Sequence, residues 1–211
     1  MEISSNFFHC GQSDPKAKTC SSASLNYSSI HCDHRVEFEL QVKRNCDSVI
    51  LKFNLVKLTI EKNGITVSKN LDGVDPLWTD WIPNEFAWPI FSGKLKKMIV
   101  DSLRPNQKVD WIKCEISHNE EIRLYYIPIY KYGEEILDKE NTRYVENTNL
   151  IMLPVFNMDA INDLDFFILP FEYGIEGTFY ASNRLKRKLV KEKISGIDYE
   201  KNVYVASSVV K

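Results

Sequence analysis

The chain has 211 residues, of which 44% are hydrophobic and 27% are charged, and its formal net charge at pH 7 is −2. This is the composition of an ordinary globular protein, and it argues against a collagen-like, coiled-coil or wholly disordered chain. The near-neutral charge gives the chain as a whole no attraction to nucleic acid or to acidic membranes, so any electrostatic function has to be local.

The same features predict a cytoplasmic protein that does not cross a membrane. No apolar run approaches the roughly 18 to 20 residues that a membrane helix needs. The N-terminal residues, which include Glu2, Asn6 and His9, lack the basic and apolar regions of a secretory signal. The five cysteines are an odd number, and a domain of this size does not need disulfides, so we expect them to be reduced.

The N-terminal third is predicted to be strand-rich after an irregular start. The first 35 residues are rich in Ser, Asn, Cys and His and show no helical or sustained strand period, so we expect irregular structure with at most one short edge strand. Alternating apolar and polar residues then predict an antiparallel meander, with strands at residues 36–42, 49–53 and 56–60 and a hairpin turn at Lys62-Asn63-Gly64.

The remainder of the chain predicts two amphipathic helices among short strands. Each helix, at residues 92–103 and 182–193, starts at a serine suited to the N-cap and has an apolar stripe opposite its basic residues. The tryptophan-rich segment 75–89 is predicted to be an ordered connector. Further strands are predicted at residues 109–116, 122–129, 150–156, 165–169, 197–199 and 203–205.

These elements together predict the α+β class, mainly an antiparallel sheet with two principal amphipathic helices. Residues 1–75 are predicted to form a strand-rich N-terminal extension with a Cys/His-containing irregular start. Residues 76–211 are predicted to form the α+β core, and the two parts are expected to make one compact unit.

The two predicted helices stand in similar sequence surroundings. In both, a short apolar strand leads to the serine, a leucine follows three residues later, and basic residues come next. Each helix is then followed by an apolar-Asp-aromatic triplet, Val109-Asp110-Trp111 in the first case and Ile197-Asp198-Tyr199 in the second. The pattern indicates either an internal repeat or a chance similarity between two amphipathic helices.

Over about residues 76–205 the chain resembles bacterial polymorphic-toxin immunity proteins of the eleventh and forty-third numbered types, formerly a family of unknown function. The motifs that carry this resemblance are Ile90-Phe91-Ser92, Leu124-Tyr125-Tyr126-Ile127, Phe166-Phe167-Ile168, and the stretch from Tyr180-Ala181-Ser182 to Ser195-Gly196-Ile197-Asp198-Tyr199. The resemblance implies a protein that binds the C-terminal domain of a cognate toxin and inhibits it stoichiometrically. Nucleic acid and membranes are not expected as partners.

The charge pattern before the second helix predicts where such a partner would bind. From Tyr144 to Asn183 the chain has no lysine or arginine. We expect its acidic side chains to attract a basic toxin domain, because opposed potentials speed association and select partners. The predicted contact residues are Asp159, Asp163, Asp165, Glu172, Tyr173 and Glu176. The aromatic residues Phe171, Tyr173 and Phe179 are either anchors of this surface or core residues, and the basic helix face at 184–193 is interpreted as solvated.

An alternative hypothesis is a small metal-dependent hydrolase or nucleotide-processing enzyme that uses the N-terminal His/Cys cluster or His118. The candidate zinc ligands are Cys10, Cys20, Cys32 and His34. However, no Cys-x2-Cys, His-x3-His or Gly-x-Ser-x-Gly spacing occurs, capping accounts for Ser92 and Ser182, and a hairpin turn accounts for His118. We therefore expect no cofactor and no enzymatic activity. A scaffold of a secretion system is a third hypothesis.

Overall fold

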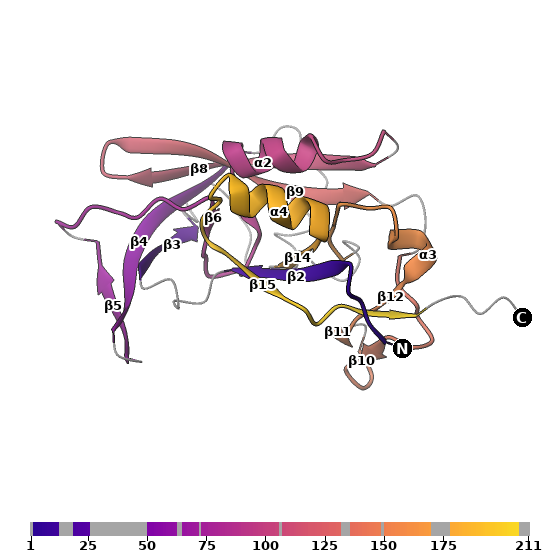
Figure 1. The fold of residues 1–211 in the computed structure, drawn as a ribbon. Coiled ribbons are helices and arrows are strands. Elements are labelled where there is room, and N and C mark those ends of the chain that lie inside the picture. Colours follow the sequence, from indigo (N-terminus) through magenta and orange to yellow (C-terminus); the bar gives the residue numbers. More distant parts are fainter. Residues whose placement is uncertain are drawn as a thin grey trace, which may run out of the picture.

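A computed structural model describes most of the chain (Figure 1). The described residues are 2–12, 19–25, 50–62, 65–71, 73–105, 107–131, 136–148, 150–169 and 178–206. They form a sheet-rich α+β structure in which antiparallel pairing dominates, in agreement with the predicted class. The predicted strand at residues 36–42 lies outside these ranges. No helix within them is long and apolar enough to cross a membrane.

The largest sheet has seven strands, with the path β3-β4-β8-β9-β7-β6 and β5 paired to β4. The strands are β3 (Thr19–Leu25), β4 (Ile50–Lys62), β5 (Ile65–Asn70), β6 (Trp81–Ile82), β7 (Ile90–Ser92), β8 (Lys108–His118) and β9 (Glu121–Lys131). Strands β4 and β5 pair as a hairpin up to Lys62 and Ile65, with Asn63 and Gly64 of the predicted turn outside the described residues, and the β8–β9 hairpin turns directly after His118. Both hairpin predictions are confirmed.

Three smaller sheets complete the β structure of the described residues. One has the order β13-β14-β2-β15, from β13 (Phe166–Phe167), β14 (Thr178–Ser182), β2 (Phe7–Gln12) and β15 (Ile197–Glu200). A second joins β1 (Glu2–Ile3), β16 (Tyr204–Ala206) and β12 (Val155–Asn157). The third is the pair β10 (Arg143–Tyr144) and β11 (Ile151–Leu153).

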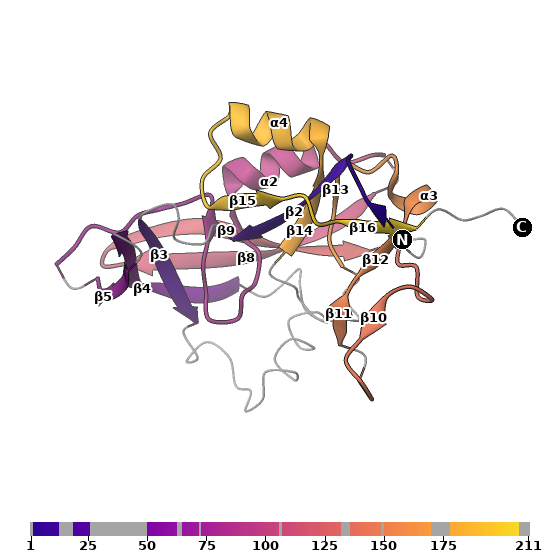
Figure 2. The same cartoon turned by 60° about the horizontal axis from the view of Figure 1, so that its bottom comes forward.

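The helices are short. Each predicted helical range contains one, α2 (Gly93–Val100) and α4 (Asn183–Lys191), and a single-turn helix, α3 (Met158–Ile161), precedes β13. Most of each predicted apolar stripe is buried, since Leu95 and Ile99 of α2 and Leu185 and Leu189 of α4 are fully inaccessible. Val190, which was expected in the buried stripe of α4, is instead 56% exposed. In both views α2 and α4 lie side by side on one side of the molecule (Figures 1 and 2).

Three strand predictions are wrong for identifiable reasons. The strand expected at 150–156 is two strands, β11 and β12, which lie in different sheets on either side of Pro154. The strands expected at 49–53 and 56–60 are one strand, β4, because the pairing with β3 skips Val56 in a β-bulge that interrupts the alternation without ending the strand. The first 35 residues, expected to be irregular with at most one short edge strand, contain β1, β2 and β3, and β2 is central rather than at the edge of its sheet. Phe7 and Phe8 are buried on its opposite faces, so β2 has no polar face and no visible period.

The similar surroundings of the two helices reflect a structural repeat. The strand order β6-β7-β9-β8 around α2 matches the order β13-β14-β2-β15 around α4. In each copy a strand pair leads into a helix and then into the next strand. The central strand of the first copy, β9, follows in sequence, whereas that of the second copy, β2, comes from the N-terminus. β2 therefore joins strands that lie beyond residue 75, and the predicted division of the chain at that position stays a prediction.

The repeat places three hydrophobic cores in a row. The shared core lies between the copies and contains Leu95 and Ile99 from α2 together with Leu185 and Leu189 from α4. The outer face of the first copy packs into one further core, through Ile82 and Ile90 among others. The outer face of the second copy packs into another, through Phe167, Tyr180 and other residues. The segment 75–89 is ordered as predicted, with Trp81 and Trp88 fully buried.

Candidate functional site

The start of each helix is built in the same way. Ser92 and Ser182 have nearly identical extended backbones, with φ of −62° and −64° and ψ of 161°. Each hydroxyl accepts a hydrogen bond from the backbone N–H three residues later, at 3.1 Å in both helices. Capping is therefore confirmed as the role of both serines.

An aspartate is hydrogen-bonded to the capping serine of each helix. The register sets Asp80 of the first copy and Asp165 of the second opposite the capping serines, and their carbonyl oxygens accept the serine N–H groups at 2.8 and 2.9 Å. The hydroxyl of Ser92 also donates to Asp80 Oδ1 at 2.6 Å, and that of Ser182 donates to Asp165 Oδ1. Each helix thus begins at a carboxylate, which its dipole favours.

The two copies of the repeat differ in the groups that donate hydrogen bonds to Oδ2 of the aspartate. Oδ2 of Asp80 accepts from the backbone N–H and the hydroxyl of Ser195, both at 3.0 Å, so the loop after α4 closes over it. Asp165 is instead held by the guanidinium of Arg184, whose Nε lies 3.0 and 2.8 Å from the two oxygens. Asp165 is only 4% exposed, whereas the Arg184 side chain is 69% exposed. The second copy is therefore open where the first is closed.

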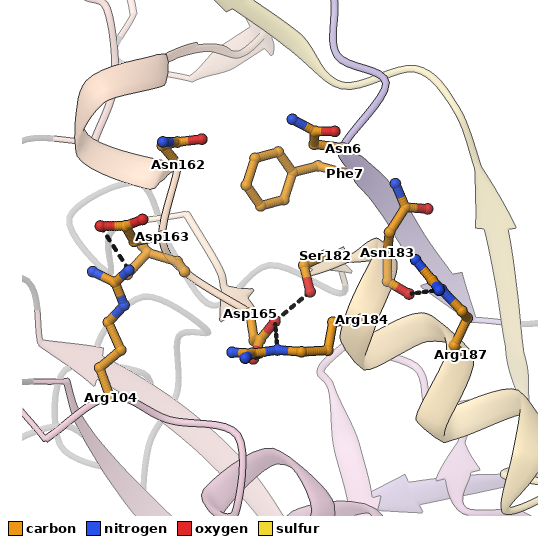
Figure 3. A pocket seen from close by; sticks show the side chains of 11 residues that line it. Asn6, Phe7, Arg104, Asn162, Asp163, Asp165, Ser182, Asn183, Arg184 and Arg187 are labelled. Atoms are coloured by element: carbon orange, nitrogen blue, oxygen red, sulfur yellow. Dashed lines mark hydrogen bonds and ion pairs between the residues drawn. The ribbon is translucent and has the colours of Figure 1, made fainter.

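An open cleft of about 390 Å³ lies at this position. We call it the arginine cleft (Figure 3). Its walls come from the turn before β2, the loop after α2, the loop between α3 and β13, and the first turn of α4. The lining residues are Asn6, Phe7, Arg104, Asn162, Asp163, Leu164, Asp165, Ser182, Asn183, Arg184 and Arg187. Hydrogen-bond donors and acceptors are thus mixed across one surface.

Most of the charged groups in the cleft are held by partners. Arg104 Nη2 lies 2.8 Å from Asp163 Oδ2, and Arg187 Nε donates to the carbonyl of Asn183 at 3.3 Å. The Asn183 amide in turn donates to the carbonyl of Ser5 at 2.9 Å. These bonds tie α4 to the N-terminal segment, so the cleft depends on segments far apart in the sequence.

The loop after α2 is fixed on the inner side of the cleft. Gln107 donates through Nε2 to the carbonyl of Phe166 at 3.2 Å and to the hydroxyl of Tyr130. Burial raises the pKa of Tyr130 to about 12, since the phenolate would lose its hydration. The phenol is therefore neutral at physiological pH, and it serves to position Gln107.

The residues predicted to bind a partner are only partly brought together. Asp163 and Asp165 line the cleft, but Asp165 is buried, so its carboxylate faces the protein. Asp159 is exposed on α3 and does not line the cleft. The other three residues, Glu172, Tyr173 and Glu176, lie outside the described part of the chain. Of the aromatic residues considered as anchors, Phe179 belongs to the shared core and is fully buried.

The candidate zinc ligands that the structure describes lie in different sheets. Cys10 is in β2 and fully buried, and burial raises the pKa of its thiol because the thiolate would be desolvated. Cys20 is in β3, while Cys32 and His34 lie outside the described residues. Within the described ranges, no three His, Cys, Asp or Glu side chains are grouped to hold a metal ion.

The nearby His9 is half-buried. Its Nδ1 lies 3.8 Å from the Glu200 carboxylate, and its ring packs against Tyr180 with centroids 5.6 Å apart. Burial lowers the pKa of His9 and outweighs the opposing effect of Glu200, so the imidazole is held neutral.

The sequence interpretation missed the basic side of the cleft. The sequence gives no indication of a role for Arg104, and Arg184 and Arg187 belong to the helix face that is interpreted as solvated. One signal was present: each capping serine is preceded by an Asp-aromatic-apolar triplet, Asp80-Trp81-Ile82 and Asp165-Phe166-Phe167. Including these triplets in the repeat would have placed a carboxylate at each helix start.

Comparisons with protein-family models and with curated proteins find no match to this chain.

Proposed function

We propose that the protein is a cytoplasmic immunity protein that binds the C-terminal domain of a cognate bacterial toxin and neutralises it by stoichiometric inhibition. The observation that carries the proposal is the arginine cleft, where the charged ends of Arg104 and Arg184 are held by Asp163 and Asp165. Side chains that are already held lose less conformational freedom on binding, so more of the contact energy contributes to affinity.

The positions of the resemblance motifs support the same proposal. Ile90-Phe91-Ser92 and Tyr180-Ala181-Ser182 form the strand ends that carry the two capping serines. In this proposal the two principal helices, each held by its serine and aspartate, form a rigid frame that presents the cleft. Such a frame suits an inhibitor that works by complementarity and slow dissociation rather than by turnover.

The described nucleophile candidates also fit binding better than catalysis. The hydroxyls of Ser92 and Ser182 each accept a backbone N–H and donate to a carboxylate, so their geometry is that of caps. The thiols of Cys10 and Cys114 are buried, and burial raises the pKa of both, which disfavours the reactive thiolate.

The proposal is tested with the C-terminal domain of a candidate toxin sought among the neighbouring genes. We expect a 1:1 complex by calorimetry and complete loss of toxin activity at one equivalent of this protein. Arg187→Ala should weaken binding about tenfold, because Arg187 lines the cleft and stabilises no carboxylate of the described chain. A matched control is Arg143→Ala on β10, an exposed arginine that does not line the cleft. A toxin that stays fully active in excess protein would refute the proposal.

A further inference from the structure

One side of the molecule carries a strong positive charge. The segments 93–101 and 183–193, which contain α2 and α4, hold nine lysines and arginines against Asp101 and Glu192, a net charge of +7. Since the whole chain carries −2, the remainder carries −9. We call these two segments the basic layer. The helices α2 and α4 lie side by side (Figure 1), and the Lys94 side chain reaches the backbone of Glu192, so the two segments adjoin.

Few of these charges are neutralised within the described part of the chain. The cations of the basic layer make one ion pair there with a carboxylate, between Arg184 and Asp165. Lys94 donates instead to the carbonyl of Glu192 at 2.6 Å, at the end of α4. Lys188 and Lys191 are exposed. Among the described residues, Lys188 and Lys191 therefore keep their charges available to a partner.

The arrangement is unfavourable for the isolated protein. On α4, Arg184, Arg187, Lys188 and Lys191 are spaced three or four residues apart, so like charges are neighbours on one face and destabilise the helix. The pKa of Lys96 on α2 is lowered by partial burial and by the neighbouring charge of Lys113. A partner of opposite charge would relieve this repulsion.

We propose that the basic layer and the arginine cleft form one docking surface for an acidic surface of a partner polypeptide. The two are continuous, because Arg184 and Arg187 belong to both. The inference rests on the proposed function, in that the partner is a protein. It reverses the sign of the surface expected from the sequence, where acidic residues were predicted to attract a basic partner.

A polypeptide fits this surface better than a nucleic acid does. A phosphate backbone that followed the basic layer into the cleft would meet the exposed carboxylate of Asp163, whereas a polypeptide can donate an N–H group to it. The rings near the layer are already covered. Lys96 Nζ lies 3.8 Å from the centroid of Tyr126, and Lys186 Nζ lies 3.5 Å from that of Phe8. Within the described residues, these rings are therefore not open platforms for base stacking.

The sign of the surface restricts how a toxin would be inhibited. A nuclease binds its polyanionic substrate in a basic cleft, and a basic inhibitor surface would be repelled from that cleft. A toxin that docks on the basic layer therefore presents an acidic surface outside any phosphate-binding cleft, or acts on a cationic substrate.

The test is a charge-reversal pair, Lys188→Glu with Lys191→Glu, against the same candidate toxin domain. A matched control, Lys57→Glu with Lys69→Glu, makes the same charge change at exposed positions of the β4–β5 hairpin. The association rate is measured by surface plasmon resonance at 0.05, 0.15 and 0.5 M NaCl. We expect the helix pair to slow association about tenfold at the lowest salt, and the control less than twofold. A second variant, Lys188→Gln with Lys191→Gln, should slow it about threefold without placing acids near the end of α4.

The outcomes separate the two proposals. If the domain binds and both glutamate pairs associate like the parent protein, the docking surface is wrong while the proposed function stands. If the domain does not bind the parent protein at all, the proposed function fails and the docking surface fails with it. A 20-nucleotide single-stranded RNA is the competing probe. Tighter binding of the RNA than of the domain at 0.15 M NaCl, lost in the helix pair, would overturn the polypeptide partner in favour of nucleic acid.

Discussion

Replacing Ser182 with alanine removes two hydrogen bonds that meet at one atom. The hydroxyl oxygen accepts the N–H of Leu185 at 3.1 Å, and its proton is donated to Asp165. Asp165 is 4% exposed, so water has little access to replace the lost bond. The substitution therefore combines the loss of a helix cap with the loss of a hydrogen bond to a buried carboxylate.

The two contributions can be added roughly. An N-cap serine stabilises by about 1 kcal/mol, and a hydrogen bond to a charged group by about 1.5 to 3 kcal/mol. We expect Ser182→Ala to lower the free energy of unfolding by about 2 to 4 kcal/mol. With a urea m-value of about 2 kcal/mol/M, the midpoint of unfolding would fall by roughly 1 to 2 M.

The measurement is urea unfolding followed by tryptophan fluorescence and far-ultraviolet circular dichroism, with the m-value compared between variants. Ser5→Ala is the control, because Ser5 is exposed and only its carbonyl is bonded to α4. The control should lie within about 0.5 kcal/mol of the parent protein. A loss for Ser182→Ala no larger than that of the control would show that the serine and aspartate do not hold the helix start.

Three further predictions concern other parts of the fold. Gly196→Ala should lower the free energy of unfolding by about 3 kcal/mol and Gly73→Ala by about 1 kcal/mol, as measured by thermal unfolding. Both glycines have positive φ, but only at Gly196 would a Cβ lie 2.5 Å from the carbonyl oxygen of Trp81. Equal losses of stability in the two variants would contradict this reasoning. Because the pKa of His9 is lowered by folding, the unfolded chain binds a proton at this histidine at a higher pH than the folded protein does. The free energy of unfolding should therefore fall as the pH drops below about 6.5, and it should fall less in His9→Gln. Parallel curves of stability against pH for the two proteins would exclude this role of His9. Cys10 should react with iodoacetamide only after denaturation, as judged by peptide mass spectrometry, and labelling of the native protein would argue against its burial.

The elements predicted from the sequence are those whose signals are local. Ser92 and Ser182 cap their helices with bonds that span three residues, and the turn after His118 closes between neighbouring strands. The apolar stripes of the helices are also periodic in sequence, so their buried faces could be identified. In each case the interacting residues lie close together in the chain, and the physical rule acts on the sequence directly.

Pairing between distant segments could not be derived in this way. Strand β2 pairs with β14 on one side and β15 on the other. Its two phenylalanines are buried on opposite faces of the sheet, so its sequence has no alternation that would predict a strand, and it does not indicate which strands it pairs with. The sequence around the two helices indicates the repeat, but the remaining strand of the second copy, β2, comes from the N-terminal end of the chain.

The arginine cleft was likewise decided by the tertiary structure. Asn6, Arg104, Asp163 and Arg184 come from four separate segments, and the cleft is open only because Arg184 rather than a backbone loop bonds Asp165. The sequence by itself determined where each helix begins and which face it buries, since those depend on hydrogen bonds and periods of a few residues. Which strands pair, and which charges share a surface, depend on contacts between segments that only the folded chain brings together.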